Sequence, residues 1–130
     1  MPQFPVTESR AKILAKIPDY AVQILPCSGS VRVSFADTVI AESKRALLVR
    51  ETKHADVFYI PREDVLMDLF ERTQHSTYCP FKGHASYWTL SVNGAVSENI
   101  VWSYEDPYPE VIDLKDYMSF YTDRTISIVL

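Results

Sequence analysis

The chain has 130 residues, of which 47% are hydrophobic, and this is enough apolar material for one domain to bury a core without disulfides or a structural metal. Its formal net charge of −4, with no block of five like charges, argues against a nucleic-acid-binding protein. The hydrophobic runs are short and the first residues lack a signal-peptide pattern, so we expect a single cytoplasmic domain over 1–130, with no membrane segment.

The predicted elements begin with an arm and a short helix. Residues 1–8 contain two prolines and no periodicity, and Ser9–Ile17 has the apolar spacing of a helix that Pro18 ends. Tyr20–Leu25 is the first expected strand.

A hairpin is expected next. Val31–Phe35 alternates apolar and polar residues, as a half-buried strand does, and Ala36-Asp37 is the expected tip. Further strands are expected over 38–42, 46–51 and 56–60.

A second helix is predicted from Pro61 to about Arg72. A proline in the first turn, followed by two acidic residues, suits a helix N-terminus. The apolar residues after them have the spacing of a buried helical face: Val65, Leu66, Leu69 and Phe70.

A second hairpin is predicted around Asn93-Gly94. This dipeptide between strand-like runs is a strong hairpin signal, because both central residues of the turn need positive φ. The flanking strands are expected over His84–Val92 and Ala95–Tyr104.

Aromatic residues gather in this hairpin. Counting back from the turn places Ala85 opposite Trp102, so Tyr87 and Trp102 become neighbours on one face, and Tyr104 shares the face of Trp102. These rings either form part of an aromatic box for a flat or cationic ligand or belong to the core.

The remaining chain reads as a short strand and a helical turn over Val111–Tyr121, followed by a closing strand over Thr125–Leu130. This last strand could be an edge with an apolar face, which makes a homodimer a possible assembly. The expected fold class is therefore mainly β: a compact antiparallel domain with one or two short helices.

The stretch Thr77–Tyr87 is the densest in residues that can do chemistry. Cys79 is a candidate nucleophile there, with His84 or His75 as base and Lys82 as an anchor for an anion. The alternative is that the Cys79 thiol packs as a small hydrophobic group.

No metal site or other cofactor is expected. Cys27 and Cys79 are far apart, and the chain has neither a C-x-x-C nor an H-x-x-x-H pair. Both thiols are expected to be free.

The run Thr77-x-Cys79-Pro80-Phe81-Lys82-Gly83-x-Ala85-x-Tyr87 resembles the hallmark of the family catalogued as domain of unknown function family 427. The resemblance covers the chain from about Val31 onward and leaves residues 1–25 outside. Four further segments are similar to the family's: Ala41-Glu42-Ser43, Arg45-Ala46-Leu47-Leu48-Val49-x-Glu51, Tyr59-Ile60-Pro61-x-x-Asp64-Val65 and Trp102-x-Tyr104-x-x-Pro107.

The resemblance implies a mostly antiparallel β domain similar to the β-tent architecture. Relatives of that architecture bind zinc through paired cysteines, and some hold small ligands in an aromatic cage. This chain lacks paired cysteines. The family is also labelled nucleotidyltransferase-like, but the Gly-Ser signature and paired metal-binding aspartates of ordinary nucleotidyltransferases are missing here.

Three functions remain open. The first is binding of an unidentified small molecule, and the candidate ligand-binding residues are Arg45, Glu51, Tyr59, Cys79, Lys82, Tyr87, Trp102 and Tyr104. The second is a cysteine-dependent or nucleotide-handling enzyme that uses Cys79, His84 and Lys82. The third is a protein-interaction domain without a ligand, in which the aromatic residues are core.

Overall fold

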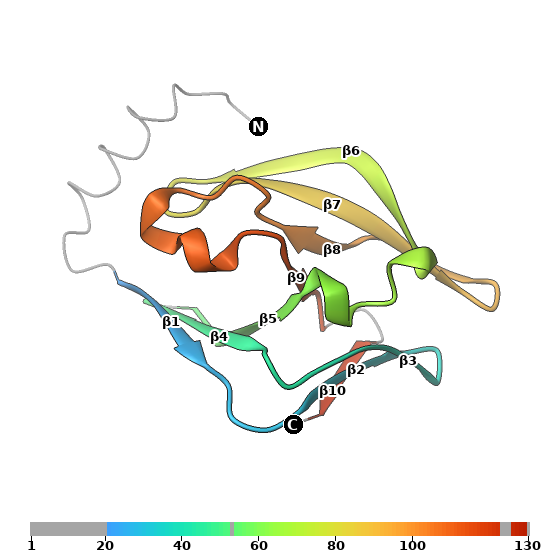
Figure 1. The fold of residues 1–130 in the computed structure, drawn as a ribbon. Helices are drawn as coiled ribbons and strands as arrows, with labels where there is room; N and C mark the ends of the chain where they lie inside the picture. Colours follow the sequence, from blue (N-terminus) through green and yellow to red (C-terminus); the bar gives the residue numbers. More distant parts are fainter. Residues whose placement is uncertain (1–20, 53, 123–125, 130) are drawn as a thin grey trace.

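A computed structural model describes residues 21–52, 54–122 and 126–129 (Figure 1). Over these ranges the chain is mainly antiparallel β structure, as expected, and its helical segments are short 3-10 turns. The helix predicted over Ser9–Ile17 lies outside the described residues. No helix in the described ranges is both long and apolar enough to cross a membrane.

Two sheets make up the described fold. The larger has seven strands in the order β1 (Val22–Pro26), β4 (Leu47–Glu51), β5 (Val57–Pro61), β9 (Tyr117–Phe120), β8 (Ala95–Ser103), β7 (Gly83–Val92) and β6 (Phe70–Cys79). The smaller has three, in the order β10 (Ile126–Val129), β2 (Val31–Phe35) and β3 (Thr38–Ser43). The 3-10 turns are η1 (Arg62–Asp64), η2 (Met67–Leu69) and η3 (Pro109–Leu114).

A first apolar cluster fills the space between the two sheets. Val33 and Ile40 come from the small sheet, which lies below β7 and β8 in Figure 1, and they share this cluster with Leu90, Ile100 and Met118 of the large sheet. All five side chains are fully buried. Burial of these side chains is the main favourable contribution to holding the sheets together.

A second cluster lies inside the large sheet. Val49 and Tyr59 of β4 and β5 pack with Ala85 and Tyr87 of β7, and Leu114 of η3 closes the cluster. Strands that are separated within the sheet order therefore meet around one set of side chains, so the sheet is curved. Strand β7 serves both clusters because successive side chains point to opposite faces.

The two predicted hairpin turns are confirmed. Ala36 and Asp37 have φ of 49° and 61° between β2 and β3, and Asn93 and Gly94 have φ of 49° and 86° between β7 and β8. Positive φ at both central residues is the type I′ pattern, whose twist matches that of the flanking strands.

The predicted pairing of β7 with β8 is correct near the turn and wrong farther away. Val92 pairs with Ala95 and Leu90 with Ser97, but an irregularity after Trp88 shifts the register. Tyr87 therefore lies directly opposite Trp102, a place that the sequence count gave to Ala85. The extra residues of a β-bulge cause such shifts in register, and the alternation of apolar and polar residues does not predict where a bulge occurs.

The helix predicted from Pro61 to Arg72 is wrong. Only the short turns η1 and η2 form there, and β6 begins at Phe70. Val65 makes an isolated antiparallel bridge with Ala41, and its neighbour Leu66 donates a backbone hydrogen bond of 2.9 Å to Ile40. These contacts with β3 hold the segment extended, so tertiary pairing overrides the helical spacing.

We predict that Leu90→Ala lowers the free energy of unfolding by about 2–5 kcal/mol, because the fully buried side chain leaves a cavity in the first cluster. Leu66→Ala is the matched control, since that leucine is 54% exposed, and we expect it to change stability by less than about 0.5 kcal/mol. Urea unfolding of both variants measures the difference, and equal losses would contradict this account of the core.

Candidate functional site

A buried ion pair joins two distant parts of the large sheet. The Lys82 ammonium, in the turn between β6 and β7, contacts the carboxylate of Glu51 at the end of β4. The side chains are only 7% and 13% exposed. Buried charges are costly unless they are paired, and this pairing places a donor and an acceptor side by side beneath the surface.

The turn that carries Lys82 is held by its backbone. The Lys82 amide donates to the carbonyl of Cys79 at 3.2 Å, and the Lys82 carbonyl accepts from the amide of Tyr108 at 3.0 Å. Gly83 follows with φ of +114°, and a Cβ atom there would lie 3.4 Å from the backbone oxygen of Asp106. The positive φ therefore favours glycine at this position, and the backbone of the neighbouring chain packs against it in van der Waals contact.

Hydrogen bonds fix the aromatic side chains beside the ion pair. The Trp102 indole nitrogen donates to the Tyr59 hydroxyl at 3.1 Å, and the two rings meet edge to face. Trp102 also lies 4.5 Å from Tyr121 between ring centroids. The Tyr87 hydroxyl is hydrogen-bonded to the hydroxyls of Thr77 at 2.9 Å and Tyr121 at 3.5 Å.

These groups surround a pocket of about 270 Å³. Its lining comes from strands β4 to β8, from the β4–β5 and β6–β7 connections and from residues just after β8 and β9, so the curvature of the sheet creates it. Seven of the eight candidate ligand-binding residues line it: Glu51, Tyr59, Cys79, Lys82, Tyr87, Trp102 and Tyr104.

Two buried tyrosines of the pocket, Tyr59 and Tyr104, are poor acids. Burial raises the pKa of Tyr59 and of Tyr104, and the hydrogen bond from Trp102 acts in the opposite direction on Tyr59. Both phenols therefore stay protonated at physiological pH. They offer hydroxyl groups for hydrogen bonding, and neither serves as a general base.

Cys79 faces the pocket without a histidine partner among the described contacts. Its Sγ lies 4.0 Å from the Lys82 Nζ. Gly83 of β7 pairs with Cys79, so the next residue, His84, points to the other face of the strand. There it packs against Tyr78, with 5.0 Å between ring centroids. His75 lies four residues before Cys79 along β6, which separates their Cα atoms by roughly 13 Å. This separation is too large for direct proton transfer between the two side chains.

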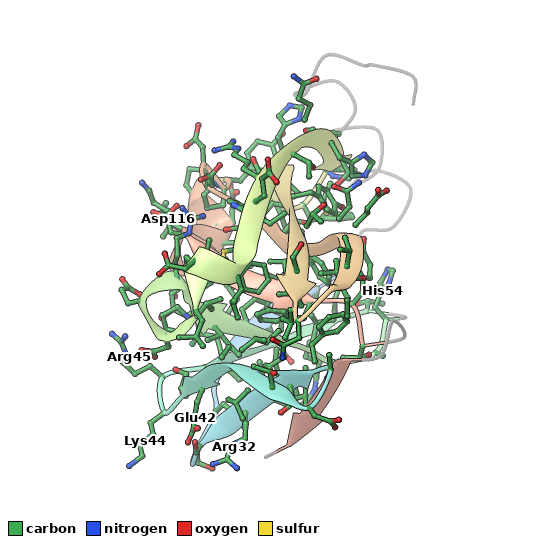
Figure 2. All side chains as sticks on the ribbon, turned by 90° about the vertical axis from the view of Figure 1, so that its right-hand side faces the viewer. Arg32, Glu42, Lys44, Arg45, His54 and Asp116 are labelled. Carbon is green, nitrogen blue, oxygen red and sulfur yellow. The ribbon has the colours of Figure 1, made fainter. Side chains whose placement is uncertain are left out.

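Arg45, the eighth candidate, lies elsewhere. Its guanidinium contacts Asp64 at 3.1 Å and Glu63 at 4.0 Å. Figure 2 shows Arg45 on the opposite side of the molecule from His54, which lines the pocket. Arg45 is therefore part of a surface ion pair away from this pocket.

Sequence reasoning missed several lining residues. His54 lies at the rim, with its Nε2 atom 3.8 Å from Glu51, and Tyr121 packs on Trp102. Neither belongs to a recognisable motif, and both follow strands whose positions depend on the curvature of the sheet. The small and aliphatic lining residues Ala55 and Val57 carried no signal, and Val49 lies in a family-like motif but was not among the candidates.

A metal site does not form within the described part of the chain, where no three histidine, cysteine, aspartate or glutamate side chains gather closely enough to hold an ion. Cys27 and Cys79 are both free thiols, and each is partly buried.

Comparison with known proteins identifies a family. Residues 23–129 match the family model described as Domain of unknown function (DUF427). No curated protein matches the chain.

We predict that Lys82→Met or Glu51→Leu alone lowers the free energy of unfolding by about 3–5 kcal/mol, because either change leaves one buried charge without its partner. The double variant should lose much less than the sum of the two, since it buries no charge. A double-mutant cycle from urea unfolding measures this coupling.

The exposed pair Arg32–Glu42 is the matched control, with side chains 53% and 49% exposed. Its cycle should give a coupling of at most about 1 kcal/mol. Equal coupling at the two pairs would mean that the pair beside the pocket has no special role in stability.

The contacts of Asp64 predict a pH-dependent stability. The hydrogen bond from Ser43 at 2.6 Å, together with Arg45, holds the pKa of Asp64 below its usual value. A carboxyl whose folded pKa is lowered stabilises the fold above its unfolded pKa of about 4, and this contribution is lost as the pH falls through the folded pKa. Asp64→Asn should therefore be less stable than wild type at neutral pH, and the difference should vanish in acid.

Urea midpoints measured across the acid range check this expectation. Asp68→Asn is the control, because Asp68 is exposed, and its difference from wild type should stay small throughout. A difference for Asp64→Asn that persists unchanged in acid would show that its charge is not responsible.

Proposed function

The chain belongs to the DUF427 family, and we propose that it binds a compact planar small molecule in the pocket beside Lys82 and Glu51. The observation that carries the proposal is the buried donor–acceptor pair that lines a pocket with aromatic walls. The proposed ligand class is a flat ring with a carbonyl next to an N–H group: a cyclic amide, imide or ureide, or a nucleobase.

The hydrogen-bonding capacity of the ion pair supports this class. An ammonium has three donors and a carboxylate has two acceptor oxygens, so their mutual contact leaves capacity on both groups. A ring carbonyl would accept from Lys82 while the adjacent N–H donates to Glu51. Because the pair is neutral as a whole, a neutral ligand leaves no buried net charge.

The walls and the size support a planar ring. Tyr59, Tyr87 and Trp102 present ring faces and edges that favour stacked or edge-to-face contact with a flat ligand. The volume of about 270 Å³ is near the lower end of ligand pockets, which commonly measure about 300–1,000 Å³. The volume of this pocket therefore suits a single compact ring.

Two observations favour binding over the alternative functions. A cysteine enzyme with His84 or His75 as its base is disfavoured, because these rings pack against Tyr78 and Tyr87 and not against Cys79. In a purely structural aromatic core, Trp102 would be fully buried with no cavity beside it, whereas here it is partly exposed and lines the pocket.

Tryptophan fluorescence tests the proposal. In a Trp88→Phe background Trp102 is the sole tryptophan of the chain. Titration with hydantoin and with uracil should give a saturable change in its emission, because the ring packs beside Trp102. The variant Glu51→Leu/Lys82→Met in this background should lose the response, since the donor and acceptor are gone.

Arg45→Ala is the control, because Arg45 lies away from the pocket, and it should bind as the parent does. The proposal fails if a panel of cyclic amides, ureides and nucleobases gives no saturable response. It also fails if the response survives in the double variant.

A further inference from the structure

We infer that the ligand carries an apolar tail, which passes Trp102 and Tyr121 into a second hollow of the same molecule. This inference rests on the proposed function, because it places the planar head of the ligand beside Lys82. It extends the ligand class from a small ring to an amphipathic molecule with a polar head and an apolar chain.

The second hollow adjoins the first. Five residues line both: His54, Ala55, Val57, Trp102 and Tyr121. The Trp102 and Tyr121 rings, 4.5 Å apart, form the partition between the two spaces. Ala55 carries the smallest side chain of this shared rim, so it leaves the most room for a chain to cross.

The second hollow is larger than the first, and its lining is more apolar. Its volume is about 520 Å³, and its own apolar lining comes from Phe58, Phe120 and Ile128. These three side chains pack on the cluster between the sheets or belong to it, so the hollow lies where β5 and β9 meet β10. It thus continues from the pocket toward the small sheet.

The polar residues of the second hollow lie at its surface. His54, Asp56 and Thr122 are exposed, and Asp56 already pairs with Arg50 at 3.2 Å. Its described lining has no counterpart of the buried Lys82–Glu51 pair. A polar head therefore has partners in the first space, and the second space offers mainly apolar contact.

This contrast indicates which end of a ligand goes where. Removing a methylene group from water into apolar surroundings improves affinity by up to about fourfold. A tail linked to the head gains this affinity without a further loss of translational freedom. A separate apolar molecule would lose its own translational freedom on binding. The most favourable single occupant is a planar head with an alkyl chain.

Hydantoins that carry a methyl, butyl or octyl group on the ring carbon test the inference. With the full-length chain, affinity should rise along the series by up to about fourfold for each methylene that enters the second hollow. Isothermal calorimetry measures the dissociation constants, and a more negative heat-capacity change for the longer chains reports apolar burial.

Ile128→Trp fills the second hollow and lines no part of the first. It should remove most of the advantage of the octyl compound and leave the methyl compound unchanged. Thr122→Trp, at the exposed rim, gives the same test if the first variant does not fold. Val96→Trp is the matched control, because Val96 is 61% exposed and lines neither space.

The outcomes separate the two proposals. If the methyl compound binds through the Lys82–Glu51 pair but affinity is flat along the series, the tail is wrong and the proposed function stands. An octyl advantage that survives both tryptophan variants also overturns the inference, since the chain then lies elsewhere. If no compound binds, or if octyl binding persists in Glu51→Leu/Lys82→Met, the head assignment fails and the inference fails with it.

Discussion

The contact between Lys82 and Glu51 is the constraint around which the large sheet is arranged. It connects the β6–β7 turn with the end of β4, two segments that are far apart in the strand order. A buried ion pair gains stability only if the chain holds both charges in place, because each has lost its water. The backbone bonds of the turn and the close packing at Gly83 provide that positioning.

Much of this site could be predicted from the sequence, because its residues lie in motifs and in alternating strands. The turn at Asn93-Gly94 and the side-chain period of two predicted that Tyr87 and Trp102 share a face, although the register that they gave for these two residues was wrong. The stretch from Cys79 to Gly83 stood out by its chemistry. The structure shows why Glu51 and Tyr59 lie beside these residues: the sheet is curved, and the second apolar cluster joins its strands.

The errors have physical causes that a single sequence does not reveal. The spacing from Pro61 to Phe70 fits a helix, but bonds to Ile40 and Ala41 of β3 keep the segment extended. The bulge after Trp88 shifts the strand pairing, and nothing in the alternation marks it. Arg45 lies in a motif together with Glu51, yet its side chain pairs with Asp64 on another side of the molecule.

The hydroxyl contacts of the pocket explain how its walls stay in place without a ligand. Trp102 is held by Tyr59, and Tyr121 is linked through the Tyr87 hydroxyl to Thr77. Each ring therefore belongs both to the second apolar cluster and to a chain of polar contacts, which limits its rotation. A ligand that enters such a pocket loses little affinity to ordering the protein. The partition formed by Trp102 and Tyr121 is part of the same arrangement, so the geometry of the polar pocket and that of the apolar hollow beside it are coupled through these two rings.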